Sequence, residues 1–336
     1  MTIAWKTVGD PSTASGRYRA FIPCRHLREA GWQCEIYQPS RAAHYELVIF
    51  QKVYDEDAIR LVGELRSRGV KTVFDLCDNH YHYELDNPEG ARNRADRLNR
   101  MIEAVDAVSV STPALVEVVE KATGRSAVII DDAVEVPRLE PLSSAYHALR
   151  ARLVSGWRRS LRIVWYGIAG GKQPPFGMID LKRVLPSLEI LHREIPLSLT
   201  VISNSRSSFR EYANGASFPV RYEKWRQDSF PHVFAPHDVC VIPVNPNPFT
   251  LCKTSNRVIT SLLLGVPVVA DRIPSYEEFS GFILFSEWVE SLRAYATDPA
   301  QRERHVEQGR HYIRSRYDKD RVVSQWSSLF RSLAVS

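Results

Sequence analysis

Short apolar runs alternate with longer amphipathic segments through the first half of the chain. The runs have the length and the content of β-branched residues of buried strands, and the segments between them place apolar residues at helical spacing. We predict strands at Thr2–Val8, Cys34–Gln38, Leu47–Lys52, Thr72–Leu76, Ala107–Ser111 and Ala127–Asp131, and helices at Tyr18–Ala30, Asp57–Ser67, Arg92–Val105 and Pro113–Thr123. Strands that alternate with helices in this way form βαβ units, so the pattern predicts a parallel sheet with helices on both faces.

The alternation pauses and then restarts. Residues 135–159 carry Pro137, Pro141 and a basic helical segment with Arg150 and Arg152, a composition typical of an interdomain linker. Beyond it we predict strands at Leu161–Gly167, Leu197–Ser203, Val239–Val244 and Pro267–Ala270, and helices at Met178–Arg193, Asn256–Leu264, Glu287–Ala296, Gln301–Ser315 and Arg321–Leu333. The sequence therefore predicts an α/β protein with two Rossmann-like, doubly wound domains, residues 1–150 and 151–320, and a terminal segment 321–336.

Length and composition agree with two ordinary globular domains. The chain has 336 residues, of which 44% are hydrophobic and 25% charged, and a domain usually holds about 100 to 200 residues. The longest apolar run, Val258–Ala270, contains Gly265 and Pro267 and is too short for the ~20 residues of a membrane-spanning helix. Because the N-terminus also lacks a basic flank followed by an apolar block, we expect a cytoplasmic protein.

Cysteine content argues against disulfide and zinc sites, whereas the net charge leaves several classes of binding partner open. The five cysteines include no C-x-x-C pair, so neither a disulfide framework nor a zinc knuckle is indicated. A net charge of +5 fits a solvated surface with an arginine excess, and it equally fits phosphorylated substrates or anionic lipid headgroups. The charge therefore leaves open peripheral association with the inner membrane surface and a modified DNA acceptor.

The loop after the first strand is a candidate phosphate site. In open α/β sheets, ligands lie beyond the carboxyl ends of the strands, where helix N-termini favour anions. The loop GDPSTASGRYR combines small residues that permit close backbone approach with arginines that add positive charge for a diphosphate. Its candidate binding residues are Gly9, Ser15, Gly16 and Arg17, with Arg19 as a second guanidinium. It matches neither G-x-G-x-x-G nor a Walker A sequence, which argues against a dinucleotide enzyme or a P-loop NTPase, and a flexible loop with solvated arginines is the alternative.

Two loops of the second half carry similar chemistry. The strand LRIVWYG leads through a glycine-containing loop to Gly171 and Lys172, where a lysine can reach a bound phosphate. After the strand VCVIPV, a Pro/Asn-rich loop leads to a short helix for which Ser255 and Asn256 are predicted N-cap residues. The candidate phosphate or donor residues there are Lys253, Thr254, Ser255, Asn256, Arg257 and Thr260. A purely structural helix cap is the alternative, with a contribution of ~1 kcal/mol.

The second half resembles the nucleotide-binding domain of the family 4 retaining glycosyltransferases. The resemblance is carried by Val164–Gly167 with Gly171 and Lys172, and above all by KTSNRVITSLLLGVPVVAD at Lys253–Asp271; FDLCD and VSVSTPALVEVV add softer likeness. It implies the GT-B architecture, in which two Rossmann-like domains face each other across a cleft and the last helix, 321–336, returns to the first domain. It also implies metal-independent transfer of a sugar, with retention of configuration, from a nucleotide diphosphate sugar to an acceptor hydroxyl.

One position departs from the family pattern. An acidic residue that is thought to bind the donor ribose usually stands five positions before the glycine of Gly-x-Pro, and here that position is Thr260. A hydroxyl can bond one ribose oxygen but cannot provide a charge-assisted acceptor for both hydroxyls. A nucleotide-sugar epimerase of the same fold and a non-catalytic glycosyltransferase-like partner subunit therefore remain as alternatives.

The acceptor side is predicted in the first domain. Asp78, with His80 as the alternative, follows the strand TVFDLCD and is expected to orient or deprotonate the acceptor hydroxyl, with a pKa raised by burial near a diphosphate. Asp55-Glu56-Asp57 matches a D-x-D metal motif, but it directly opens a helix, where acidic residues complement the helix dipole, so we expect a helix start rather than a metal site. The predicted catalytic residues are Asp78, His80, Lys172 and Lys253. We predict no metal or cofactor; the donor is a nucleotide sugar co-substrate and the acceptor a glycan, a lipid-linked sugar or a small molecule.

Overall fold

The computed structural model describes residues 1–135, 139–154, 160–213 and 215–335. The chain forms two compact units: unit 1 comprises Met1–Glu135, Leu251–Thr254 and Arg316–Ser336, and unit 2 comprises Val136–Thr250 and Ser255–Ser315. Helix α6, Pro141–Val154, therefore belongs to unit 2, whereas the sequence-based division places most of it in the first domain. Parts of the predicted linker, 136–138 and 155–159, lie outside the described residues.

Unit 1 is built on a six-stranded sheet in which every neighbouring pair is parallel. The sheet order is β2 (Gln33–Ile36), β1 (Thr2–Thr7), β3 (Leu47–Gln51), β4 (Lys71–Leu76), β5 (Ala107–Val110) and β6 (Val128–Ile129). All five residues of β3 are buried, which explains its continuous apolar run, because a central parallel strand is covered on both faces. The other elements are α1 (Ala14–Gly16), a π-helical turn η1 (Arg17–Phe21), α2 (Ile22–Glu29), η2 (Pro39–His44), α3 (Glu56–Ser67), η3 (His80–His82), α4 (Pro88–Ala104), α5 (Pro113–Thr123) and α13 (Lys319–Val335).

Side-chain caps set the ends of several helices in unit 1. The Asp55 carboxylate accepts a hydrogen bond from the Ala58 amide and caps α3, whose start at Glu56 agrees with the predicted helix start. The Thr112 hydroxyl accepts a bond from the Leu115 amide in the same way, and α5 ends at Gly124 in the left-handed region. The sequence-based bounds of α5 are reproduced because both of its end signals are local.

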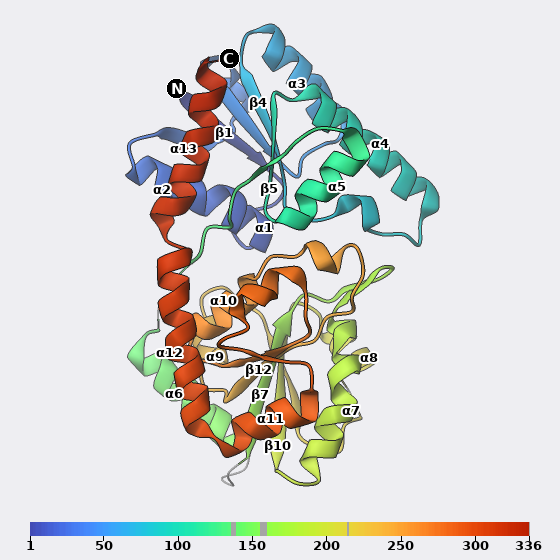
Figure 1. Ribbon diagram of the computed structural model, residues 1–336, viewed down its shortest axis with the longest axis vertical. Helices are drawn as coiled ribbons and strands as arrows, with labels where there is room; N and C mark the ends of the chain where they lie inside the picture. Colours follow the sequence, from blue (N-terminus) through green and yellow to red (C-terminus); the bar gives the residue numbers. More distant parts are fainter. Residues whose placement is uncertain (136–138, 155–159, 214, 336) are drawn as a thin grey trace. The chain divides into compact units, whose positions relative to one another are not determined.

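The C-terminal helix α13 covers one face of the first sheet. It lies beside α2 (Figure 1), and Trp326 and Phe330 are buried in one cluster with Trp5 of β1. The rings of Trp5 and Trp326 meet edge to face with centroids 5.5 Å apart. Burial of a large apolar side chain contributes ~1.5–3 kcal/mol, so α13 is an integral part of the core of unit 1.

Unit 2 contains a second parallel sheet, also of six strands. Its order is β11 (Val220–Lys224), β10 (Leu197–Ser203), β7 (Leu161–Gly167), β12 (Val239–Ile242), β13 (Val268–Ala270) and β14 (Leu284–Phe285). The other elements are the hairpin β8 (Gly170–Lys172) and β9 (Pro175–Gly177), η4 (Met178–Asp180), α7 (Leu181–His192), α8 (Arg206–Tyr212), α9 (Phe230–Phe234), η5 (Thr250–Cys252), α10 (Asn256–Leu263), η6 (Pro274–Phe279), α11 (Trp288–Thr297) and α12 (Pro299–Arg316). The two helix-covered parallel sheets confirm the predicted α/β class.

The glycine-containing loop predicted after β7 is instead the hairpin β8–β9. Gly170 has a φ of 78°, and a Cβ atom at this position would lie 1.8 Å from the carbonyl oxygen of Phe176. Only glycine fits there, because the two strands of the hairpin approach each other at the backbone. The glycines of this stretch therefore serve a tight hairpin.

The strand orders define one topological switch point in each sheet. In unit 1 the chain order reverses between β1 and β3, and in unit 2 it reverses between β7 and β12. Loops that leave neighbouring strands in opposite directions open a crevice beyond the carboxyl ends of those strands, where ligands of open α/β sheets bind. The switch points therefore locate the candidate sites.

In the part of the chain that the structure describes, no helix has the length and apolar character needed to cross a membrane.

Candidate functional site

The loop after β1 is closed by its own hydrogen bonds. Gly9 has a φ of 82°, and the Asp10 carboxylate accepts bonds from the amide and the hydroxyl of Ser12. A Cβ atom on Gly16 would lie 2.8 Å from the hydroxyl of Thr13, so both predicted glycines are needed for the tight path. The Arg17 guanidinium donates to the Pro11 carbonyl at 3.0 Å, which makes Arg17 a support of this loop. Ser15 lies in α1, the first turn that follows.

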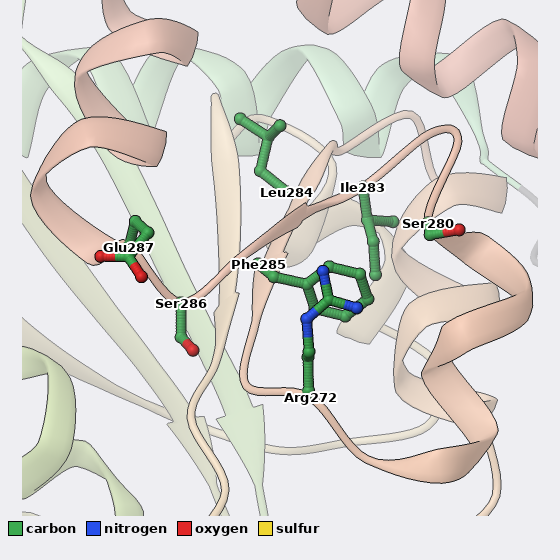
Figure 2. A pocket seen from close by; sticks show the side chains of 7 residues that line it. All are labelled: Arg272, Ser280, Ile283, Leu284, Phe285, Ser286 and Glu287. Carbon is green, nitrogen blue, oxygen red and sulfur yellow. The ribbon is translucent and has the colours of Figure 1, made fainter.

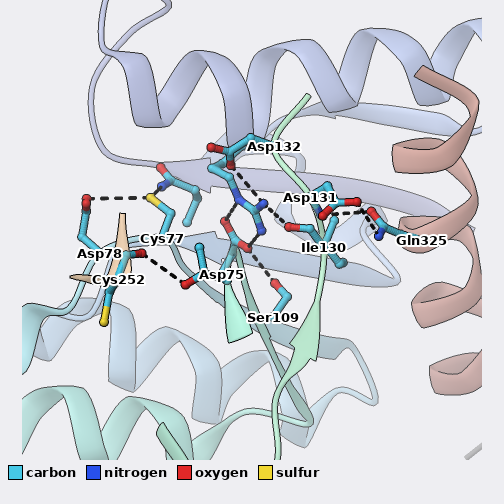
Figure 3. Close-up of polar contacts among 12 residues, drawn as sticks. Asp75, Cys77, Asp78, Ser109, Ile130, Asp131, Asp132, Cys252 and Gln325 are labelled. Atoms are coloured by element: carbon cyan, nitrogen blue, oxygen red, sulfur yellow. Dashed lines mark hydrogen bonds and ion pairs between the residues drawn. The ribbon is translucent and has the colours of Figure 1, made fainter. Parts of the chain in front are cut away.

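Arg19, predicted as a second phosphate ligand, lies instead in the core of unit 1. Its side chain is 1% exposed and forms an ion pair with Asp75, which is 0% exposed. Asp75 also accepts a bond from Ser109 at 2.7 Å, and Asp132 lies beside the same cluster (Figure 3). A buried charge requires such pairing, so the Arg19 guanidinium neutralises the buried carboxylate of Asp75 and has a structural role. The prediction for Arg19 is wrong because its side chain is buried and paired with Asp75 inside unit 1.

The carboxylate of Asp78, just beyond the carboxyl end of β4, forms ion pairs with two lysines. One carboxylate oxygen accepts a bond from Lys52 at 2.5 Å, and the other accepts a bond from Lys253. The side chains of Lys52 and Asp78 are 16% and 15% exposed, and that of Lys253 is 34% exposed. Lys253 reaches Asp78 because Leu251–Thr254 belongs to unit 1, where Thr112 donates to the carbonyl of Cys252 at 3.1 Å. The structure thus brings Asp78 and Lys253 together.

The charge state of Asp78 differs from the sequence-based expectation. Burial alone would raise the pKa of its carboxyl, but the ammonium groups of Lys253 and Lys52 outweigh burial and hold the pKa far below its usual range. The expected upward shift is therefore wrong, and Asp78 is a carboxylate at neutral pH. Burial and the charge of Lys52 lower the pKa of His80 to about 3, so its imidazole is neutral and bonds the Tyr54 hydroxyl at 2.7 Å.

Lys52 is a site residue that the sequence-based reasoning missed. It follows β3 directly, at the switch point of unit 1, and it has a φ of 58°. The left-handed region is unfavourable for a residue with a side chain, and such strain is concentrated at functional sites. The available signal was a lysine at the end of an inner strand, but a lysine there is equally expected at a solvated loop.

In unit 2, Arg257 lies in the first turn of α10. Its guanidinium lies over the rings of Trp165 and Tyr166, 5.4 and 5.5 Å from their centroids. The Nε and Nη2 atoms are buried, and among the described residues neither has a hydrogen-bond partner. Ser255 is the N-cap residue of α10, as predicted, although its side chain forms no cap bond with the helix backbone. An arginine with buried, unsatisfied donors at a helix N-terminus is suited to bind an anion.

Asp180 is a second residue that the sequence-based reasoning missed. It is 3% exposed and accepts bonds from the backbone amide and the side-chain amide of Asn245, which follows β12. Burial raises the pKa of Asp180 to about 6, although Asn245 and the positive charge of Arg257 oppose the shift. These hydrogen bonds connect η4, which follows the β8–β9 hairpin, to the loop after β12.

The remaining predicted donor residues are spread over several elements. Lys172 lies in β8 next to Gly171, is 68% exposed, and pairs with Glu211 of α8 at 2.9 Å. Thr254 belongs to unit 1 with Lys253, whereas Ser255 and the α10 residues Asn256, Arg257 and Thr260 belong to unit 2. The segment predicted as one donor-binding motif is therefore divided between the units.

A pocket of about 500 Å³ lies beside the edge strand β14 (Figure 2). It is lined by Arg272, Ser280 and Ile283–Glu287. Arg272 stacks on the ring of Phe285 at 3.9 Å and pairs with Glu277 at 2.8 Å, so its charge is already compensated. Because β14 is remote in strand order from the switch point between β7 and β12, we place the candidate site of unit 2 at Arg257.

Comparison with solved structures identifies the fold. The Anabaena protein HepE, in complex with UDP and glucose, aligns with a TM-score of 0.69 and 14% identity over 98% of this chain and 99% of its own. WaaG, a glycosyltransferase involved in lipopolysaccharide biosynthesis, aligns with a TM-score of 0.66 and 13% identity over 97% of this chain and 99% of its own. The chain has the GT-B fold. This confirms the predicted architecture of two Rossmann-like domains.

The GT-B likeness extends to a third structure, α,α-trehalose 6-phosphate synthase from Burkholderia multivorans. It aligns with a TM-score of 0.56 and 14% identity over 96% of this chain and 82% of its own. No family model matches the sequence, and no curated protein does. The GT-B assignment therefore rests on three-dimensional structure.

Proposed function

We propose that this protein transfers a sugar from a nucleotide diphosphate sugar to an acceptor hydroxyl, without a metal ion and with retention of configuration. The observation that carries the proposal is Arg257, whose buried Nε and Nη2 atoms lie at the N-terminus of α10 and have no hydrogen-bond partner within the described part of the chain. Three findings support it: the GT-B fold, the motif at Lys253–Asp271 that resembles the family 4 enzymes, and the description of HepE as a complex with UDP and glucose. Retention rests on the family resemblance.

The proposed chemistry depends on stabilisation of the leaving diphosphate. Cleavage of the donor bond places additional negative charge on the diphosphate, and preorganised donors that meet this charge lower the barrier. In the proposal, the Arg257 guanidinium provides those donors at the start of α10, with Lys172 and Lys253 as further cations. Asp78 and His80 are proposed to orient the acceptor hydroxyl; an ionised carboxylate with a strongly lowered pKa orients well but is a weak base.

The substitution Arg257→Gln tests the donor site. Loss of a charge-assisted phosphate contact costs ~1.5–3 kcal/mol, or roughly a ten- to hundredfold loss of affinity. Binding of UDP, GDP, ADP, dTDP and CMP is measured by calorimetry for the parent and the variant. Arg193→Gln is the matched control, because Arg193 is an exposed arginine at the far end of α7. Equal nucleotide affinities for the parent and Arg257→Gln would contradict the donor site.

The two predicted lysines are tested in the same titration. We expect Lys172→Ala and Lys253→Ala each to weaken binding of the preferred nucleotide diphosphate, and we expect their effects to be non-additive if both reach one diphosphate. Lys253→Ala also removes one of the two lysines that pair with Asp78, so the melting temperature is measured alongside. Unchanged affinity in both lysine variants would remove the lysines from the donor site.

Thr260 favours a second candidate function, a non-catalytic glycosyltransferase-like subunit. The family's acidic residue would accept bonds from both ribose hydroxyls, and a threonine cannot replace it. Thr260→Glu is expected to strengthen nucleotide binding if the site is built for a ribose. A parent protein that binds nucleotide sugars but neither transfers nor hydrolyses them would favour the non-catalytic role.

A further inference from the structure

Lys52 is held in an unfavourable backbone conformation at the switch point of the first sheet. Its φ of 58° places it in the left-handed region, where the backbone amide donates to the carbonyl of Asp75 at 3.0 Å. Only 16% of its side chain is exposed, yet the ammonium group is at the carboxyl end of β3, at the switch point of the first sheet. Asparagine or glycine would satisfy this backbone more easily, so the backbone does not explain the lysine.

A second lysine contacts the carboxylate that pairs with Lys52. Lys52 and Lys253 both donate to the carboxylate of Asp78, and His80 is neutral. Glu84, in the loop that follows η3, is paired with Arg94. An ammonium group has three donors, and within the described residues the structure gives that of Lys52 one hydrogen-bond acceptor, Asp78. Two ammonium groups thus contact one carboxylate, and the ammonium group of Lys52 has donors beyond the one that Asp78 accepts.

We propose that Lys52 binds a phosphate group carried by the acceptor. The inference rests on the proposed function and names its acceptor class: a phosphorylated sugar or alcohol rather than a neutral one. Lys52 belongs to unit 1, the acceptor side, whereas unit 2 has its own anion site at Arg257. A phosphate monoester carries about −1.5 to −2 charges at neutral pH and has oxygens that accept several bonds, which matches the unused donors.

Asp78 has a defined part in this arrangement. Its carboxylate accepts a bond from the Lys52 ammonium group at 2.5 Å and fixes the position of that group, so the group is oriented before a phosphate arrives. The arriving phosphate binds the remaining donors of that group. Asp78 is thus a positioning residue for the phosphate site, and Lys52 is the group that contacts the ligand.

The experiment measures binding of glucose 6-phosphate, glucose and inorganic phosphate by calorimetry, with the preferred nucleotide diphosphate as a separate titration. Lys52→Asn removes the charge and tolerates the left-handed backbone. We expect the parent to prefer glucose 6-phosphate over glucose, and Lys52→Asn to weaken glucose 6-phosphate binding about ten- to hundredfold. Nucleotide binding is expected to stay within about threefold in that variant. Lys121→Asn, an exposed lysine at the end of α5, is the control.

Two outcomes of these titrations would contradict phosphate binding by Lys52. Glucose 6-phosphate bound equally by the parent and Lys52→Asn, or no more tightly than glucose, would show that Lys52 binds no acceptor phosphate. An equal loss of nucleotide affinity in Lys52→Asn would assign Lys52 to the donor diphosphate instead. Lys52→Arg keeps the charge and should retain glucose 6-phosphate binding, which separates charge from folding. Failure of the proposed function would be seen independently, as the absence of nucleotide binding by the parent.

Discussion

The ion pair between Lys52 and Asp78 is the contact whose removal should be most informative. Its two side chains lie 2.5 Å apart and are 16% and 15% exposed. A hydrogen bond between charged groups in such a setting contributes ~1.5–3 kcal/mol, whereas an exposed pair contributes ~1 kcal/mol or less. We therefore expect a coupling free energy of about 2 kcal/mol in a double-mutant cycle of Lys52→Asn and Asp78→Asn. Asp78→Asn alone should cost more, about 2 to 4 kcal/mol, because it leaves the ammonium groups of Lys52 and Lys253 without their shared partner.

The assay is urea unfolding of the parent, the two single variants and the double variant at pH 7. The pKa of Asp78 is lowered in the folded state, so its stabilising contribution is present above the unfolded pKa of ~4 and is lost as the pH falls further. The advantage of the parent over Asp78→Asn should therefore shrink when unfolding is repeated below pH 4. A coupling free energy below about 0.5 kcal/mol would refute the description of this pair as a buried, organising contact.

Three further predictions concern the rest of the fold. Gly170→Ala should destabilise the protein far more than Gly31→Ala. A Cβ atom on residue 170 would lie 1.8 Å from the Phe176 carbonyl oxygen, whereas a Cβ atom on residue 31 would have no neighbour within 4 Å. The melting temperatures of the two variants test this difference. Arg19→Met should lower the free energy of unfolding by about 3 to 5 kcal/mol, since it leaves buried Asp75 without its partner, and a loss under 1 kcal/mol would contradict the buried pair. The pKa of Asp180 is raised to about 6, so the folded state binds the proton more tightly and the stability contribution falls as the pH rises from ~4 to ~6. Asp180→Asn should therefore gain stability relative to the parent over that interval, and a pH-independent difference would contradict the shift.

The elements that could be predicted from sequence are those with local signals. Strand β3 contains the apolar run Leu47–Phe50, β4 is buried over most of its length, and α5 lies between a threonine cap and a left-handed glycine. Strand β11 escaped prediction because it is an edge strand whose residues, VRYEK, are only partly buried and show no apolar run. The hairpin β8–β9 escaped it because glycines that permit close strand contact cannot be distinguished in sequence from glycines of a phosphate loop.

The candidate site was predictable only in part, because its charge pattern depends on contacts between distant residues. The positions of Asp78 and Arg257 at strand ends or helix starts follow from the alternation of elements. The lowered pKa of Asp78 does not, since it depends on Lys253, which is 175 positions away in the chain. The inward orientation of Arg19 depends likewise on Asp75, 56 positions away.

The most direct test of the proposed function is turnover of nucleotide sugars. The parent, Arg257→Gln and the control Arg193→Gln are each incubated with UDP-, GDP-, ADP- and dTDP-sugars, with and without glucose 6-phosphate, and release of the nucleoside diphosphate is measured. The account predicts release from at least one donor by the parent and by Arg193→Gln, with a loss of roughly ten- to hundredfold in Arg257→Gln at an unchanged melting temperature. No release from any donor, or equal release by Arg257→Gln and the parent, would contradict the account.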